Sequence, residues 1–218
     1  MTSTLAPDVI DRLTGIAPGE VLDAIRARRA QARLHGQNSY LALFEPAAAI
    51  DSGFTVPERL AVAAFVSALH RQAEATAFYA SGFAQSGGDG GVIDVVVTEA
   101  AAIETSGPYG RYPPGPLTVE DAPGPAYRVN DAHARLLGPR LSAALAHAHL
   151  LVFHPRDAGA QHLQALLDAG WSSTDIVTLS QLVAFLAYQL RVVSGLQALQ
   201  SASAPIASKA SVGEAAAS

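Results

Sequence analysis

The stretch FTVPERLAVAAFVSALHRQAEATAFYASGF, residues 54–83, decides the fold. Thr55 is a suitable N-cap, Pro57 suits a first helical turn, and most of the following residues are good helix formers, so the sequence predicts a helix here. Apolar side chains cover nearly the whole circumference at 60–69, which predicts burial deep in a helical assembly. Polar residues interrupt this apolar stretch at 70–74, and they indicate either a site or a bend.

The remaining sequence favours the same fold class. Half of the 218 residues are hydrophobic and alanine is frequent, whereas only 6% are aromatic. This composition is typical of helices that pack closely on small side chains. We therefore predict one all-α domain with a short helical turn within 37–53 and with helices near 20–35 (ended by Gly36), 92–105, 130–153, 157–169 and 174–197.

Composition and charge also exclude several classes of function. The net charge is −5, and the basic run at 26–29 is predicted to be a solvated helix face, so we expect no nucleic-acid partner and no binding to an anionic membrane. The chain has no cysteine, which excludes disulfides, thiolate metal sites and thiol nucleophiles. The first residues do not resemble a signal peptide, so we expect a cytoplasmic protein. Polar residues interrupt the apolar window at 176–193, which favours a helix covered by its neighbours or by another subunit over a membrane span.

Three segments carry a family resemblance. PERLAVAAFVSALHRQAEATAFYASGF (57–83) resembles the core helix-turn-helix of the carboxymuconolactone decarboxylase and alkylhydroperoxidase D-like superfamily. ALAHAHLLVFHPRDA (144–158) and LLDAGWSSTDIVTLSQLVAFLAYQLRVVSGLQAL (166–199) resemble later helices of its peroxidase-related branch. The resemblance implies an alkylhydroperoxidase D-like helical bundle that is usually a homo-oligomer. The implied domain covers 38–199 with a proline-rich loop at 107–124, after an N-terminal segment and helix at 1–37 and before a flexible tail at 200–218.

In active members of this superfamily, the resemblance implies a thiol peroxidase with a Glu, a Cys-x-x-Cys pair and a following His as a proton relay. This sequence has Gln72 and Ala75 at the two cysteine positions, Tyr79 at the histidine position and Leu60 at the glutamate position. Attack on a peroxide by the family route needs a thiolate, and the relay needs groups that exchange protons. The resemblance therefore implies a peroxide or antioxidant context in which this chain lacks the thiol mechanism.

His70 and Glu74 are the candidates for replacement chemistry. On a continuous helix they share a face, where they form a solvated pair, a charge-tuned catalytic pair or two metal ligands. On the same helix they point away from Gln72, Ala75 and Tyr79, so a relay moved into the family pocket needs a helix break. Members of the superfamily bend near this position, at a glycine that this chain replaces with Arg71.

Arg191 and the proline-rich loop supply further candidates for ligand binding. Arg191 lies in an apolar helix, which predicts either a structural ion pair, with Glu58 or Glu74 as a partner, or a bound ligand carboxylate. Tyr109, Arg111 and Tyr112 either clasp the loop or cover the mouth of a pocket. With Tyr79, the candidate ligand-binding residues are thus Tyr79, Arg191, Tyr109 and Tyr112.

The histidines of the C-terminal half are predicted to cap helices and to form local hydrogen bonds. His147 and His149 are two residues apart and diverge on a helix, unlike a metal-binding pair four residues apart. A metal site made from one of these two with His154 and His162 is the less favoured alternative. We therefore predict no metal and no cofactor.

Two functions remain open from the sequence. The favoured one is a ligand-binding or accessory protein, with a small organic ligand or an active peroxidase-like relative as its partner. The alternative is a thiol-free enzyme that uses decarboxylase- or isomerase-like acid and base chemistry on a small organic substrate, with His70, Glu74, Tyr79 or Arg191 as its reactive groups.

Overall fold

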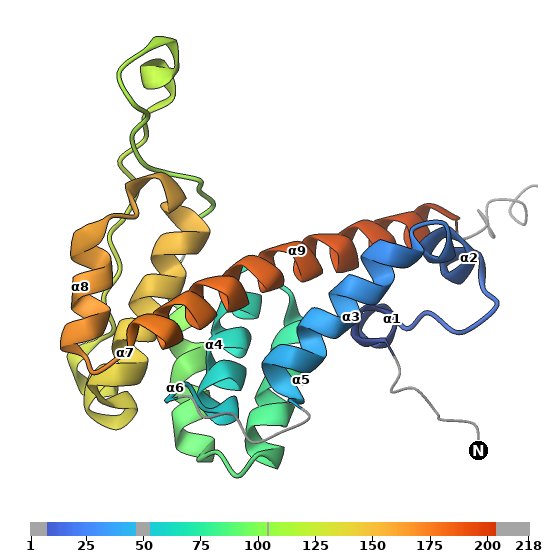
Figure 1. The fold of residues 1–218 in the computed structure, drawn as a ribbon, viewed down its shortest axis with the longest axis horizontal. Coiled ribbons are helices and arrows are strands. Elements are labelled where there is room, and N and C mark those ends of the chain that lie inside the picture. The colour runs from blue at the N-terminus through green and yellow to red at the C-terminus, as the bar shows by residue number, and fades with distance from the viewer. Residues whose placement is uncertain (1–7, 47–52, 104, 204–218) are drawn as a thin grey trace, which may run out of the picture.

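The protein is helical throughout the ranges that its computed structural model describes, which are residues 8–46, 53–103 and 105–203 (Figure 1). These ranges contain no strand, only an isolated bridge between Gly110 and Ala122. The predicted all-α class is confirmed. The elements are α1 (Val9–Thr14), α2 (Val21–Ala27), α3 (Ala30–Phe44), α4 (Val56–Leu69), α5 (Ala73–Gln85), α6 (Gly90–Ala101), the 3-10 helix η1 (Pro116–Glu120), α7 (Asp131–Phe153), the 3-10 helix η2 (Pro155–Asp157), α8 (Ala160–Asp168) and α9 (Ser173–Ser203).

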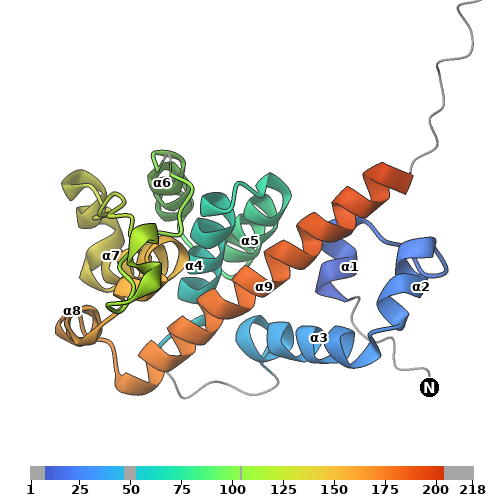
Figure 2. The same ribbon diagram turned by 90° about the horizontal axis from the view of Figure 1, so that it is seen from above.

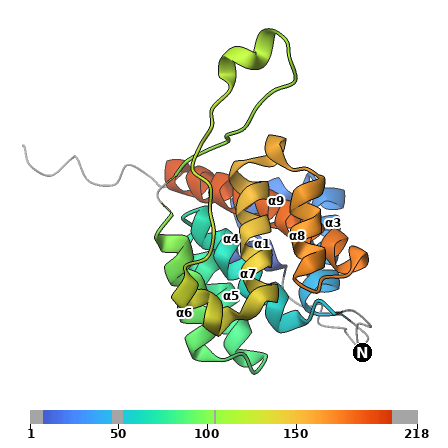
Figure 3. The same ribbon diagram turned by 90° about the vertical axis from the view of Figure 1, so that its left-hand side faces the viewer.

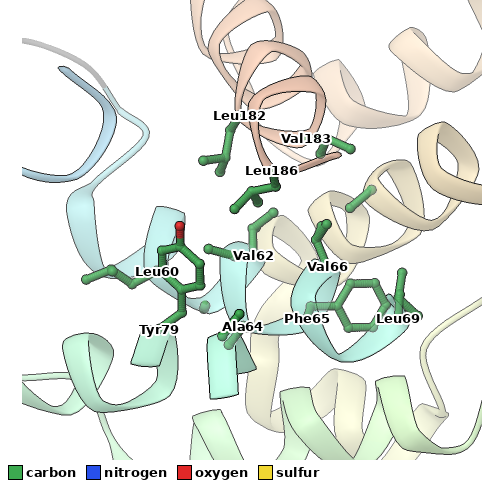
Figure 4. Packing of buried hydrophobic residues seen from close by; sticks show 14 of the residues in the cluster. Leu60, Val62, Ala64, Phe65, Val66, Leu69, Tyr79, Leu182, Val183 and Leu186 are labelled. Carbon is green, nitrogen blue, oxygen red and sulfur yellow. The ribbon is translucent and has the colours of Figure 1, made fainter. Parts of the chain in front are cut away.

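Helix α4 lies at the centre of the core, as its uninterrupted apolar sequence predicts. It contacts α3, α5, α6, α7 and α9, and its residues 60–67 are all buried. Thr55 caps α4 through a reciprocal pair of hydrogen bonds with Glu58, and Pro57 lies in the first turn. Figure 4 shows Val62 of α4 beneath Leu186 of α9 in the centre of this packing. The alanines of α4 let its neighbours approach closely on several sides.

Helix α9 crosses the whole molecule. At 1.5 Å per residue its 31 residues span about 45 Å, and it contacts α1, α3, α4, α7 and α8. Figure 2 shows α1 to α3 on one side of α9 and α4 to α8 on the other. Helices α7 and α9 are both long and apolar enough to cross a membrane by length and composition, and 44% and 50% of their apolar windows are buried inside the protein. Core helices of soluble proteins pass the same test.

The N-terminal third differs from the predicted pattern. The single helix expected at 20–35 is two helices, and α3 continues through Gly36 to Phe44 instead of ending there. Gly36 is buried against the ring of Tyr188 on α9, so tertiary packing outweighs the tendency of glycine to end a helix. The basic run is only partly solvated, because Arg26 is buried and forms ion pairs with Asp8 and Asp11 at the start of the unpredicted helix α1.

The polar interruption at 70–74 contains a turn. Helix α4 ends at Leu69 and α5 begins at Ala73, with Arg71 between them in the left-handed region at φ 58°. Within the described ranges, every other residue with a positive φ is a glycine. The long segment is therefore a helix-turn-helix, and side chains before and after Arg71 do not follow one helical phase.

Later elements follow their local signals with two exceptions. The helix predicted near 92–105 is α6, which begins at Gly90 and ends at Ala101; Asn130 caps α7, and Pro155 follows the end of α7. However, α7 is kinked at Gly138 and Pro139, because proline cannot supply a backbone N–H. The proline-rich composition of 107–124 predicts a loop that wraps the surface, whereas the loop projects from the bundle (Figures 1 and 3). Most of the predicted flexible tail lies outside the described residues, although α9 itself continues to Ser203.

Candidate functional site

The residues that the predicted alignment places at the relay positions are mostly packed into the core. Leu60, Ala75 and Tyr79 are buried, and Figure 4 shows Leu60 beside the Tyr79 ring. The hydroxyl of Tyr79 donates a hydrogen bond to Oε1 of Gln189 on α9 at 2.5 Å, and burial raises the pKa of Tyr79. Gln72 is half-buried at the N-cap of α5. Tyr79 is thus a core residue with an internal partner, which leaves it no exposed surface for a ligand.

The turn at Arg71 separates His70 from Glu74. Glu74 is exposed, and its Oε2 accepts a hydrogen bond from Gln197 at 3.0 Å. His70 ends α4 as its C-cap, and its buried Nε2 atom has no hydrogen-bond partner among the described residues. Burial lowers the pKa of His70, and the positive charge of Arg191 lowers it further. The shared helical face expected for His70 and Glu74 does not form, because it required a continuous helix.

His70 instead lines a pocket with Arg191, and this pocket is the candidate site. Its volume is about 790 Å³, within the range of small-molecule sites. The turn after α4 supplies His70 and Arg71, and the middle of α9 supplies residues including Arg191. The remaining walls come from 105–108, at the start of the proline-rich loop, and from 151–153, Pro155 and Arg156 around the end of α7.

Three guanidinium groups give this pocket a positive character. Arg71, Arg156 and Arg191 all line it, and none has a carboxylate partner in the part of the chain that the structure describes. Arg191 is exposed and, among the described residues, donates only to the carbonyl of Ala187, at 3.0 Å. The Nε atom of Arg156 is buried and has no hydrogen-bond partner within the same ranges.

The ion pair expected for Arg191 is therefore absent from this chain's described residues. Glu58, one of the two proposed partners, bonds Arg140 at 2.8 Å near the start of α4. Glu74, the other, bonds Gln197. Arg191 avoids the cost of burial because it lies on an exposed face of α9, where its side chain borders both solvent and the pocket.

The two loop tyrosines support the pocket from outside. Tyr112 stacks under Arg156, with the guanidinium carbon 4.1 Å from the ring centre, and its hydroxyl accepts a hydrogen bond from Arg156 Nη1 at 3.1 Å. Tyr109 shares a hydrogen bond with the hydroxyl of Thr105, a residue of the pocket wall, and packs against His154. Neither tyrosine lines the pocket. Both act as clasps that position residues of its wall.

The pocket combines these cations with apolar walls. Aliphatic and aromatic side chains form much of its lining: Leu69, Leu151, Val152, Phe153, Val183, Ala184 and Ala187. Arginine binds carboxylates through two parallel N–H groups, and such charge-assisted bonds are about twice as strong as neutral ones. The arrangement suits a molecule with an anionic group and an apolar body.

Sequence reasoning found part of this site. It identified His70 and Arg191 separately, whereas Arg156 and Ser180 were not considered, because their contribution depends on how α7, α9 and the loop approach one another. Gln189 was also missed as the partner of Tyr79, although an amide in an otherwise apolar helix is a usable signal of a buried hydrogen bond. Within the described ranges, no group of three or more histidine or acidic side chains is arranged to hold a metal ion.

Comparison of the chain with models of known protein families and with curated proteins found no match. The functional interpretation consequently depends on the pocket, its charges and its unpaired nitrogen atoms.

Proposed function

We propose that this protein binds a small organic acid in the pocket formed by Arg71, Arg156 and Arg191. The observation that carries the proposal is the presence of these three guanidinium groups around one apolar pocket without a carboxylate partner among the described residues. A ligand carboxylate would supply the missing negative charge, and the walls at 151–153 and at Val183, Ala184 and Ala187 would cover its apolar body.

The proposed bundle is of the alkylhydroperoxidase D-like type, in a homo-oligomer. The helix-turn-helix of α4 and α5 supports this assignment, since Gln72 is the N-cap of α5 and Ala75 lies in its first turn. A redox cysteine pair placed at these positions would lie at a helix N-terminus, where thiolates are stabilised. With no cysteine in the chain, the proposed role is ligand binding, or assistance to an active peroxidase-like relative, in a cytoplasmic setting.

The test is calorimetry with benzoate and hexanoate, and with benzamide and hexanamide as neutral matches. We expect the acids to bind and the amides to bind at least tenfold more weakly, because a hydrogen bond to a charged group is worth about 1.5–3 kcal/mol. Arg156→Gln and Arg191→Gln should each weaken acid binding by about tenfold or more. Arg135→Gln, at an exposed residue of α7 that is outside the pocket lining, should not. Equal binding of acids and amides would contradict the proposal.

A second candidate function, a thiol-free enzyme, is favoured by His70. Its buried Nε2 has no partner among the described residues, its pKa is lowered, and it lines the same pocket. A neutral imidazole beside an anchored carboxylate is suited to removing a proton from a carbon atom of the same ligand. If this function is correct, His70→Gln will abolish conversion of a bound acid and leave its affinity within a fewfold of the original. Unchanged product formation in that variant would exclude His70 as the base.

A further inference from the structure

A second cavity lies beside α7 and α8, and it differs in chemistry from the arginine pocket. Its volume is about 380 Å³, and its lining includes residues 123–127 of the segment before α7. Small and aliphatic side chains such as Ala143, Ala146 and Leu166 form its apolar walls. Four histidines also line it: His147, His149, His154 and His162. Their hydrogen bonds determine which ring nitrogens can meet a ligand.

His147 presents an unused acceptor atom. The hydroxyl of Ser180 donates its single hydrogen to the carbonyl of Ile176 at 2.9 Å. The same hydroxyl oxygen lies 3.2 Å from Nε2 of His147, and in this second hydrogen bond it is the acceptor. Nε2 of His147 therefore carries the hydrogen. A neutral imidazole protonated at Nε2 has a bare lone pair at Nδ1, and this Nδ1 is buried without a partner among the described residues. The His147 side chain is only 5% exposed, so water gives this acceptor little compensation.

The other three histidines have different roles in the cavity wall. His154 uses both ring nitrogens, with Nδ1 3.1 Å from Asp157 and Nε2 2.9 Å from the carbonyl of Pro125. His162 accepts a hydrogen bond from the Gly159 N–H at its Nδ1, which leaves its Nε2 as a donor in the neutral ring. His149 stacks on Tyr127, with ring centres 4.9 Å apart, and gives the wall an aromatic face.

The cavity is also uncharged at neutral pH where it borders His147 and His149. Burial lowers the pKa of His147, and burial lowers the pKa of His149 to about 4. An anion would lose hydration against the apolar walls and would meet the carboxylate of Asp157, which also lines the cavity and bonds His154 and the N–H of Arg111. A neutral ligand with a hydrogen-bond donor fits these conditions best.

We propose that this cavity is a binding site for small uncharged aromatic alcohols of the phenol class, whose hydroxyl donates a hydrogen bond to Nδ1 of His147. The aromatic body lies against the apolar walls and the rings of His149 and Tyr127. The hydroxyl supplies the partner that the buried Nδ1 of His147 lacks among the described residues, and binding requires a small shift of the wall that brings this atom to the cavity surface. The site is separate from the proposed acid pocket and does not depend on it.

The first test uses phenol and its methyl ether, anisole, with the intact protein in the presence of EDTA. We expect phenol to bind at least tenfold more tightly, because anisole has the same ring but no hydrogen to donate to His147. Long-range ¹H–¹⁵N spectra of the histidine rings give a direct readout. In the free protein Nδ1 of His147 should appear as an unprotonated nitrogen, and its signal should move upfield when phenol is added. Equal affinity for the two compounds, or a hydrogen on Nδ1 in the free protein, would overturn the proposal.

The second test uses variants of the cavity wall. His147→Gln keeps an amide N–H for Ser180 but has no atom at the Nδ1 position, so phenol should lose its advantage over anisole. Ala146→Leu fills the cavity and should abolish binding of both compounds. Ala132→Leu, at an exposed residue of α7, is the matched control. Phenol binding that survives Ala146→Leu would place the compound elsewhere and refute the site.

The same variants separate this proposal from the proposed function. Arg191→Gln should weaken binding of benzoate and leave phenol binding unchanged. Ala146→Leu should abolish phenol binding and leave benzoate binding unchanged. If the protein binds phenol and anisole equally but prefers benzoate to benzamide, the second site alone is rejected. If it binds benzoate and benzamide equally but prefers phenol to anisole, the acid pocket alone is rejected.

Discussion

Arg71 connects the turn between α4 and α5 with the charge of the acid pocket, and two substitutions separate these roles. An L-amino acid in the left-handed helical region is strained by about 1–2 kcal/mol, whereas glycine is not. Glycine loses more conformational entropy on folding, a cost of about 0.5–1 kcal/mol relative to alanine. Arg71→Ala keeps the Cβ atom and therefore keeps the strain. The relief of strain in Arg71→Gly exceeds the entropy cost of glycine, so we expect Arg71→Gly to be more stable than Arg71→Ala by about 0.5–1 kcal/mol in the free energy of unfolding.

The side chain of Arg71 adds little to offset this strain. It is exposed, and its Nη2 atom is 3.5 Å from the carbonyl of Thr105, at the limit of a hydrogen bond. For a chain of this length, the expected difference corresponds to about 2 °C in melting temperature, which scanning calorimetry and urea denaturation can resolve. Both variants should weaken benzoate binding equally, since both lose the guanidinium group. If Arg71→Ala is as stable as Arg71→Gly, the left-handed conformation carries no cost and the argument for strain at this site fails.

Further predictions concern the core and the proposed lineage. The pure, metal-free protein should not turn over hydroperoxides with dithiol reductants, because it has no thiol; appreciable turnover would contradict this. A Gln72→Cys, Ala75→Cys variant should form an internal disulfide without strong peroxidase activity, and failure to form the bond would count against the superfamily alignment. His149 is neutral when folded, with its pKa lowered to about 4 against about 6.5 when unfolded, so the unfolded state takes up the proton first. The melting temperature should therefore fall between pH 7 and pH 5, and less steeply in His149→Gln; identical slopes would exclude His149 as a cause. Gly36→Ala should raise the free energy of unfolding by about 0.5–1 kcal/mol, because alanine favours a helix more than glycine does. The new Cβ atom would lie 3.6 Å from the ring of Tyr188, which is an ordinary contact. A loss of stability in urea denaturation would show that the packing of α3 on α9 cannot accept this atom.

Local signals in the sequence predicted most of the helices because each depends on a few neighbouring residues. Thr55 and Asn130 have side chains that can cap a helix, and Pro155 cannot continue one. Gly36 was misread because its role depends on Tyr188, a residue far away in the sequence. A glycine can end a helix or admit a neighbouring one, and the sequence alone does not distinguish these outcomes.

The candidate site was harder to predict for the same reason. Arg191 was correctly singled out as a charge in an apolar helix, but its proposed partner Glu58 belongs to Arg140. Tyr79 is at the position where the predicted alignment expects a relay histidine, yet its surroundings make it a core residue bonded to Gln189. Arg156 has no distinctive local pattern, and its place in the pocket depends on the path of the chain after α7.

The path of α9 has a consequence for the order in which the protein can assemble. Helices α1 and α3 pack on α9, but α3 ends at Phe44 and α9 begins at Ser173, so the ribosome makes these partners far apart in time. The faces of α1 and α3 that contact α9 reach their final burial only after α9 has emerged. Contacts between distant parts of a chain form slowly and leave apolar surface exposed in the meantime. A nascent chain without α9 can already form the contacts of α3 with α4 and of α1 with α5, but the faces of α1 and α3 that pack on α9 stay uncovered until that last helix is made.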